Sequence, residues 1–292
     1  MLHRHIVDIL DASLGRWPVV VLTGPRRCGK STIAEILRRR RGGVSLNLAT
    51  VMGRLKAKDL EGVSESVRGR LVVVEGVHRW EGLFGAVRQE VEQERRNGRF
   101  LLVGDAGVGL LRQDVGALLG MAESVEMGPL MASEVEDVER LWVRGGQPDS
   151  FEAESDFKSL ELRKEHVRRY LEEDAKELKE RVNRDRLDRV WMALAHCHGS
   201  RLEPERWVES MKVTMPTVRS YAAMLEELLL VRGLPGRDEH GNRMKGGRRW
   251  YVRDSGMLHG TLGIGDMEVL SWHPLRWKSW EGFVIENLLA GC

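Results

Sequence analysis

The sequence predicts an α/β fold for the first part of the chain, with a parallel β-sheet covered by helices on both faces. Short apolar runs, such as VVVLT at 19–23 and LVVV at 71–74, alternate with longer amphipathic stretches. Strands that are apolar on both faces are typical of parallel sheets, because helices cover both sides. In addition, a glycine-rich loop lies between the first apolar run and a helical stretch, which is the usual position of a phosphate-binding loop.

Five strands and two clear helices are predicted in this region. The strands are expected at 19–23, 44–48, 71–75, 100–104 and 124–127. The helices are expected at 31–41 and 83–96. Because helical stretches separate the strands, the strands are expected to be parallel and their crossovers right-handed.

The loop GPRRCGKS at 24–31 fits the pattern G-x-x-x-x-G-K-[ST] completely. Gly24 and Gly29 allow the backbone N–H groups to curve around a polyphosphate without β-carbon clashes. Lys30 is expected to reach the β- and γ-phosphates of ATP, and the Ser31 hydroxyl to bind Mg²⁺. The alternative, a glycine-rich turn with a chance lysine, does not explain the strand before the loop and the helix after it. The other residues assigned to the nucleotide site are Pro25, Arg26, Arg27, Cys28 and Thr32.

Three of these residues have a second interpretation. Arg26 and Arg27 either add positive charge to the site or point to solvent. Cys28 occupies a variable position of the loop, and we interpret it as filler instead of a redox switch.

An acidic residue is needed to hold the water shell of the magnesium ion. Glu75, directly after the apolar run 71–74, is the candidate for this metal-binding and catalytic role, and the alternative is a solvent-facing strand end. Many ATPases with such a loop carry a second acid next, but Gly76 has no side chain that could act as a general base. His78 and Glu81 are near in sequence, but nothing places them at the site. The sequence therefore predicts an incomplete hydrolytic site, in which Gly76→Glu should raise the rate.

Asp105 follows the fourth predicted strand. In ATPases of this type the end of that strand lies beside the γ-phosphate, where an aspartate could order a water molecule or help to hold magnesium. Asp is also among the best helix N-cap residues, and a helical stretch follows. The N-cap is the favoured interpretation, and Asp105 remains a candidate residue of the nucleotide site.

Residues 187–234 are predicted to form three helices, with Thr214 as N-cap of the third and Pro216 in its first turn. An apolar stripe on the third helix is formed by Val218, Tyr221, Ala222, Leu225 and Leu229. Thr217, Arg219 and Ser220 are left facing outward near its N-terminal end. In a helix-turn-helix, that end reads the major groove of DNA.

A glycine-rich hairpin is predicted next, at 231–251, as the wing of a winged-helix domain. Its basic residues are suited to phosphate contacts and are Arg232, Arg237, Arg243, Lys245, Arg248 and Arg249. Arg248 and Arg249 complete the candidate nucleic-acid interface. A contact between domains or subunits is an equal alternative, because Glu226 and Glu227 would repel a nucleic-acid backbone.

The expected organisation has four parts. An α/β sheet domain spans 1–140, a helical linker 141–186, a winged helix-turn-helix domain 187–256 and a C-terminal tail 257–292. The charged run at 156–186 is most simply a solvated helix spacer.

The bulk composition excludes several classes of protein. A hydrophobic content of 42% with 31% charged residues is typical of a globular protein with a core. The net charge of +2 gives no argument for binding nucleic acid or membrane, and three cysteines are too few for a disulfide framework. No apolar run approaches the about 20 residues of a membrane span, and the N-terminal stretch lacks the apolar core expected of a signal peptide. A cytoplasmic location is expected.

Seven motifs occur in a specific order along nearly the whole chain. They are GPRRCGKS at 24–31, FLLVGDA at 100–106, MGPLMASEV at 127–135, RGGQP at 144–148, RYLEEDAKEL at 169–178, WYVRDSGML at 250–258 and HPLRWKSWEGFVIENLL at 273–289. In this order the chain resembles a prokaryotic family of AAA-like P-loop ATPases. Members of that family join an ATPase domain to a winged-helix region and a C-terminal domain similar to PD-(D/E)xK nucleases.

The chain departs from this family at three points. The family's acidic strand usually reads D-E-[IV]-Q, so the resemblance makes Glu75 the metal-side acid and leaves the catalytic acid vacant at Gly76. The fourth strand usually ends in glycine and serine, where this chain has Asp105 after the glycine. The chain stops at Cys292, where the nuclease-like domain is expected to begin, so no nuclease activity is expected.

Three functions are compatible with these observations. The first is an ATP-binding protein that hydrolyses Mg·ATP slowly through Lys30, Ser31 and Glu75 and couples nucleotide state to the winged helix. The second is a module that binds nucleotide without turnover, and the third is a DNA-binding regulator with nucleotide as an allosteric ligand. A homo-oligomer is compatible with each, and no membrane partner is expected.

Overall fold

The computed structural model of the chain describes residues 4–50, 69–80, 82–104, 118–174, 183–201, 214–237 and 243–290. The chain divides into two compact units, Met1–Gly128 and Pro129–Cys292. Two residues considered for the nucleotide site, Glu81 and Asp105, lie outside the described residues. Among the described helices, none is both long enough and apolar enough to cross a bilayer.

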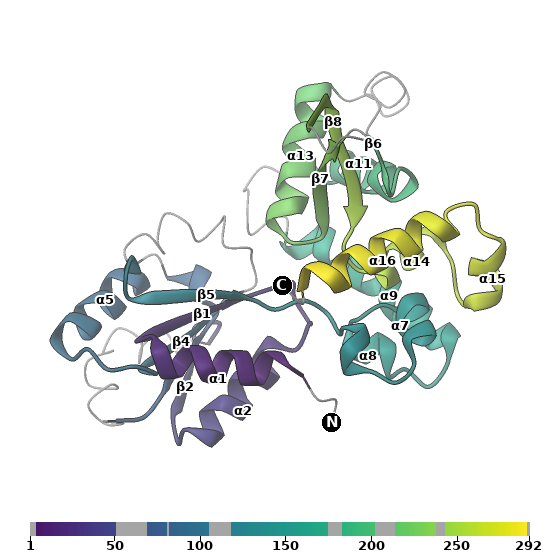
Figure 1. The fold of residues 1–292 in the computed structure, drawn as a ribbon. Coiled ribbons are helices and arrows are strands. Elements are labelled where there is room, and N and C mark those ends of the chain that lie inside the picture. The colour runs from purple at the N-terminus through teal and green to yellow at the C-terminus, as the bar shows by residue number, and fades with distance from the viewer. Residues whose placement is uncertain are drawn as a thin grey trace. The chain divides into compact units, whose positions relative to one another are not determined.

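The first unit is built around a five-stranded sheet with the order β2-β3-β4-β1-β5 (Figure 1). The strands are β1 (Val19–Thr23), β2 (Val44–Asn47), β3 (Val72–Glu75), β4 (Phe100–Val103) and β5 (Ala122–Glu126). Every pairing between them is parallel, and β1, which lies between β4 and β5, aligns Val19 with both Phe100 and Ala122. The predicted α/β fold with a parallel sheet is therefore confirmed, including its fifth strand.

Helices cover both faces of this sheet because the strands bury apolar side chains on both faces. The helices are α1 (Ile6–Arg16), α2 (Lys30–Arg40) and α5 (Leu83–Gln93), and a 3₁₀ turn, η1 (Val77–Arg79), follows β3. Val20 and Leu22 of β1 pack in one cluster with residues of α1 and α2. Val19 and Val21 pack in a second cluster with residues of α5. This alternation is the two-residue period of a strand, and it places α2 and α5 on opposite faces.

The second unit is mainly helical, with a small antiparallel sheet of order β6-β8-β7 (Figure 1). Its strands are β6 (Ser200–Arg201), β7 (Val231–Arg237) and β8 (Arg243–Val252). Its first helices are α7 (Val138–Arg144), α8 (Pro148–Phe151), α9 (Asp156–Arg169) and α11 (Arg184–His196). The later helices are α13 (Met215–Glu227), α14 (Ser255–Leu262), α15 (Met267–Trp272) and α16 (Arg276–Ala290). Two short turns of other helical types are η3 (Ala132–Glu134) and η4 (Tyr170–Asp174).

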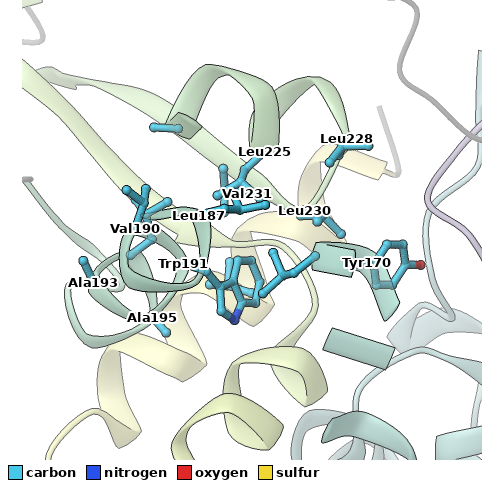
Figure 2. Close-up of a cluster of buried hydrophobic side chains, with 14 of the residues drawn as sticks. Tyr170, Leu187, Val190, Trp191, Ala193, Ala195, Leu225, Leu228, Leu230 and Val231 are labelled. Carbon is cyan, nitrogen blue, oxygen red and sulfur yellow. The ribbon is translucent and has the colours of Figure 1, made fainter. Parts of the chain in front are cut away.

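A single apolar core joins α11, α13 and the β7–β8 hairpin. Trp191 of α11 is among the largest fully buried side chains, and Figure 2 shows it beside Leu187 and Val190 of the same helix. Leu225 of α13 and Val231 of β7 belong to the same core. The indole N–H of Trp191 donates to the Thr261 hydroxyl at 2.9 Å, so the polar atom of this buried side chain has a hydrogen-bond partner.

The charged helix α9 is not a solvated spacer. Arg163 is only 1% exposed, and its guanidinium donates to the carbonyl oxygens of Val143 and Ile264 at 3.0 Å and of Gly265 at 2.8 Å. Burial lowers the pKa of Arg163 to about 10. A run of charges predicts solvation only when the charges lack internal partners, and backbone carbonyls supply those partners here.

The helix α13 begins after Thr214 and carries Pro216 in its first turn, as predicted. The Thr214 hydroxyl shares a hydrogen bond with the Thr217 hydroxyl at 2.9 Å and does not cap the backbone. The helix ends at Glu227, so Leu229, with φ of 60°, lies beyond it and not in the predicted apolar stripe.

Candidate nucleotide site

The loop 24–29 connects the buried strand β1 to the start of α2 at Lys30. All five residues of β1 are buried, so the strand fixes where the loop begins. A helix N-terminus presents free N–H groups and the positive end of its dipole, which together favour an anion. The strand and the helix that the motif requires are therefore both present.

Only glycine fits at two positions of this loop. A β-carbon on Gly24 would overlap the carbonyl oxygen of Met127, which follows β5. Gly29 has a φ of 102°, a left-handed conformation that L side chains avoid. The backbone therefore requires glycine at both positions, and the close approach of Met127 was not visible in the sequence.

The Lys30 side chain lies inside the curve of the loop and is only 4% exposed. Its ammonium group donates to the carbonyl oxygens of Gly24 at 3.0 Å and Pro25 at 2.6 Å. A phosphate oxygen in the loop would offer this ammonium group a stronger, charge-assisted hydrogen bond. Ser31 and Thr32, in the first turn of α2, are exposed, so their hydroxyls are accessible to a ligand.

The central residues of the loop differ in exposure. Arg27 is exposed with a φ of 62°, Arg26 is half-buried, and Cys28 is fully buried. The Cys28 thiol donates to the carbonyl oxygen of Met127 at 3.7 Å. Cys28 therefore packs the loop against the end of β5, which agrees with its interpretation as filler.

Glu75 lies at the carboxyl end of β3, and β4 separates that strand from β1. Strand alternation gives Glu75 the same face as Leu71 and Val73, which pack in the cluster that includes α2. The Ser45 hydroxyl donates to the Glu75 carboxylate at 3.4 Å, and Glu75 is half-exposed. The carboxylate and the start of α2 therefore lie at the same edge and on the same face of the sheet.

Gly76 also has a backbone conformation that favours glycine. Its φ of 74° is left-handed, and its N–H donates to the carbonyl oxygen of Val103 at 3.0 Å. The chain then enters η1, so β3 ends in a turn. A residue with a β-carbon costs about 1–2 kcal/mol in this conformation. A glutamate at position 76 would therefore carry a backbone cost, which the predicted gain in hydrolysis rate does not take into account.

Sequence reasoning missed Arg4, which precedes α1. Its side chain is only 7% exposed, and it donates to the carbonyl oxygens of Cys28 and Gly128, both at 2.9 Å. No motif includes Arg4, because its partners are backbone groups and leave no pattern in the sequence.

The candidate nucleic-acid residues on α13 are on the surface of the second unit. Arg219 and Ser220 are exposed, and Thr217 is half-buried. On β8, Arg249 is 53% exposed and lies 3.7 Å from Glu281. Arg219, Ser220 and Arg249 are therefore accessible to a ligand.

Two basic residues of the hairpin are bound to carboxylates within the unit. Arg248 donates to Glu226 at 2.6 Å, and Arg232 donates to both oxygens of Glu286 at 2.5 and 3.0 Å. Arg253 also donates to Glu286, at 2.9 Å. Arg232 and Arg248, which were predicted to suit phosphate contacts, are therefore paired with carboxylates of their own unit in this structure. The side chains of Arg237, Arg243 and Lys245 lie outside the described residues.

Comparisons with known proteins agree with the loop and the sheet. Residues 16–136 match the AAA domain family, and residues 135–268 match a domain of unknown function (DUF8612). Uncharacterized proteins of Mycobacterium bovis and Mycobacterium tuberculosis are each 33% identical over 284 residues, which is 96% of this chain. The chain spans 64% of the length of these relatives.

A solved structure, the Walker-type ATPase of Pyrococcus abyssi, has a TM-score of 0.58 and 14% identity. The match covers 90% of this chain and 96% of that one. At this level of identity the similarity concerns the fold alone. Residues 16–136 are therefore similar to the AAA domain family, and their parallel sheet has the α/β fold seen in a P-loop ATPase structure.

Proposed function

We propose that the first unit binds ATP with Mg²⁺ in the loop 24–31 and hydrolyses it slowly. The observation that carries this proposal is the buried ammonium group of Lys30, enclosed by a glycine loop at the start of α2. A loop of N–H groups with one ammonium suits a polyphosphate and few other ligands. A cytoplasmic location belongs to the same proposal.

The Ser31 hydroxyl and the Glu75 carboxylate are the residues that would hold Mg²⁺, since hydroxyl and carboxylate oxygens suit this ion. When bound, Mg²⁺ neutralises charge that develops on the transferred phosphoryl group. Lys30 would stabilise the same charge from the loop. Gly76 supplies no group that could activate the attacking water, which favours slow turnover. If the hydrolysis rate were zero, the first unit would be a module that binds ATP without turnover.

Calorimetric titration with ATP and Mg²⁺, followed by a steady-state turnover assay, tests the proposal. Lys30→Ala should abolish measurable binding, and Glu75→Gln should keep ATP binding but lose its dependence on Mg²⁺. Lys158→Ala is the control, because Lys158 is an exposed lysine of the second unit, paired with Glu161 at 3.3 Å. If the unmodified protein gives no heat of binding at millimolar ATP, the proposal is wrong.

We propose as a second function that α13 and the β7–β8 hairpin act as a winged helix that contacts DNA. The exposed positions of Arg219, Ser220 and Arg249 favour it. A DNA mobility shift should weaken with salt, and replacing Arg219 and Arg249 together should reduce the salt slope, because fewer phosphates are neutralised. Arg248→Ala should change DNA binding less, because Arg248 already donates to the Glu226 carboxylate. If neither the Arg219/Arg249 double variant nor Arg248→Ala changes the DNA mobility shift, this surface does not bind DNA through these arginines. A contact with another protein would then be its role.

A further inference from the structure

We propose that Arg4 is a positioning residue of the nucleotide site, which orients the Cys28–Gly29 peptide toward bound phosphate and ties it to Gly128. This inference rests on the proposed function, because the orientation of that peptide matters only if the loop holds a polyphosphate. It also assigns a route by which nucleotide binding reaches the last residue of the first unit.

The geometry of Arg4 joins two separate backbone segments. One terminal nitrogen, Nη1, donates to the Cys28 carbonyl and the other, Nη2, to the Gly128 carbonyl, both at 2.9 Å. A buried guanidinium is unfavourable unless its donors find acceptors. Because Arg4 is buried, the arrangement is stable only while both carbonyls stay in place.

Peptide planarity carries the effect to the phosphate side of the loop. In a trans peptide, the C=O of Cys28 and the N–H of Gly29 point in opposite directions. When Arg4 holds the Cys28 carbonyl, the Gly29 N–H must point away from Arg4. A hydrogen bond to the carbonyl also polarises the peptide and strengthens its N–H as a donor. Arg4 thus prepares one N–H of the phosphate cradle without touching the ligand.

Hydrogen bonds join the backbone after β5 to the loop 24–29 and to the residue before it. Met127 donates its N–H to the Thr23 carbonyl at 2.7 Å, and its own carbonyl accepts from the Cys28 thiol at 3.7 Å. Arg4 then holds the next carbonyl, that of Gly128. A shift of the loop on phosphate binding therefore moves the backbone at 127–128, after which the second unit begins.

Two variants of Arg4 and one matched control test this role. Arg4→Met removes both hydrogen bonds, while Arg4→Lys keeps the charge and can hold one carbonyl. Arg41→Met is the control, because Arg41 also makes two bonds, to the Asp11 carboxylate at 2.9 Å and the Asp11 carbonyl at 2.8 Å. Arg41 follows the far end of α2, about 15 Å along the helix axis from Lys30. Thermal melting establishes that each variant is folded.

The ATP affinity of each variant is the first readout. Arg4→Met should weaken Mg·ATP binding about tenfold, the effect of one charge-assisted hydrogen bond. Arg4→Lys should lie between this variant and the unmodified protein, and Arg41→Met should stay within about twofold. Equal affinities for Arg4→Met and the unmodified protein would overturn the inference, as would an equal loss in Arg41→Met.

Amide hydrogen exchange is the second readout, and it separates positioning from stability. ATP should slow exchange at 28–31 and at 127–128 in the unmodified protein. In Arg4→Met, saturating ATP should still protect 30–31 but no longer 127–128. Unchanged protection at 127–128 would overturn the link to Gly128. If the unmodified protein does not bind ATP, the proposed function fails first, and that result is seen without any variant.

Discussion

One backbone angle at Gly76 determines which residues can follow Glu75. The left-handed φ of 74° and the hydrogen bond to Val103 fix a turn directly after the carboxylate. Any side chain placed there must either accept this conformation or distort the end of β3. Glycine accepts it at no steric cost, and asparagine is the residue that tolerates it next best.

We therefore expect Gly76→Glu to reduce stability by about 1–2 kcal/mol and to leave hydrolysis no faster. Gly76→Asn is the matched control, because asparagine adds a β-carbon but visits left-handed conformations. Urea denaturation should show the larger loss for the glutamate variant, and a turnover assay gives the rates. A faster Gly76→Glu enzyme of unchanged stability would show that the turn rearranges freely.

The loop residues of the candidate site form a motif in the sequence, whereas the residues that support the loop do not. Lys30 and Ser31 are identified by a motif, because phosphate binding requires these residue types at fixed spacing. Glu75 is identified by its place after an apolar run. Arg4 leaves no such signal, since any arginine near the N-terminus could reach a backbone carbonyl only if the fold brings it there.

At the scale of elements, two glycine-containing segments interlock in the second unit. A β-carbon on Gly145 would overlap the Asp254 carboxylate, and one on Gly256 would overlap the carbonyl of Arg144. Asp254 caps α14 by accepting from the Met257 N–H at 2.8 Å. Its second oxygen accepts from the Gly146 N–H, also at 2.8 Å. One buried carboxylate thus joins the end of α7 to the start of α14.

Asp254→Ala should destabilise the second unit by about 3 kcal/mol or more, because two buried N–H groups lose their acceptor. Asp254→Asn should lose about half as much, because its amide keeps one acceptor oxygen. Asp266→Ala is the control: Asp266 caps α15 by accepting from the Val269 N–H at 2.9 Å, but it is only half-buried, so about 1 kcal/mol is expected. Equal losses for both alanine variants in urea denaturation would contradict the bridging role.

Element prediction succeeds where a local pattern decides the structure. The strands β1, β3 and β4 follow from short apolar runs, because burial on both faces favours apolar residues. The edge strands β2 and β5 are partly exposed and contain polar residues, so their patterns are weaker. The interlock of 144–147 with 254–256 joins segments about a hundred residues apart, and no local pattern reports it. The burial of Arg163 could not be predicted for a related reason, since its acceptors are carbonyls of α7 and of the segment after α14.

At the scale of whole units, two buried histidines should make the second unit sensitive to acid. His198 donates to the Lys278 carbonyl at 3.0 Å and accepts from the Val252 N–H at 3.0 Å. His259 likewise bonds the Val143 carbonyl at 2.9 Å and the Ser279 hydroxyl at 2.7 Å. Burial lowers the pKa of His198 to about 4 and that of His259 to about 3.

Between pH 6.5 and 4, the unfolded chain binds protons at these histidines while the folded unit does not, so stability falls as the pH falls. Each histidine should cost about 2 kcal/mol between pH 7 and pH 5. Burial raises the pKa of Asp254, which opposes this trend, so the histidine contribution must be isolated by a variant. His259→Gln should flatten the dependence of unfolding free energy on pH, and an unchanged slope would contradict the assignment.

The division of the chain into two units leads to one prediction for the whole molecule. A ligand stabilises only the folded state that binds it, by RT ln(1 + [L]/Kd), which is about 2.7 kcal/mol at one hundred times Kd. Because the loop 24–31 lies entirely within the first unit, Mg·ATP should slow global amide exchange in the strands of that unit, such as β1 and β4. Exchange in α11, at the core of the second unit, should change far less. In Lys30→Ala, ATP should protect neither unit, which excludes a nonspecific effect of the nucleotide. Equal protection of both units by ATP would show that they unfold together, and the phosphate loop would then stabilise the entire chain.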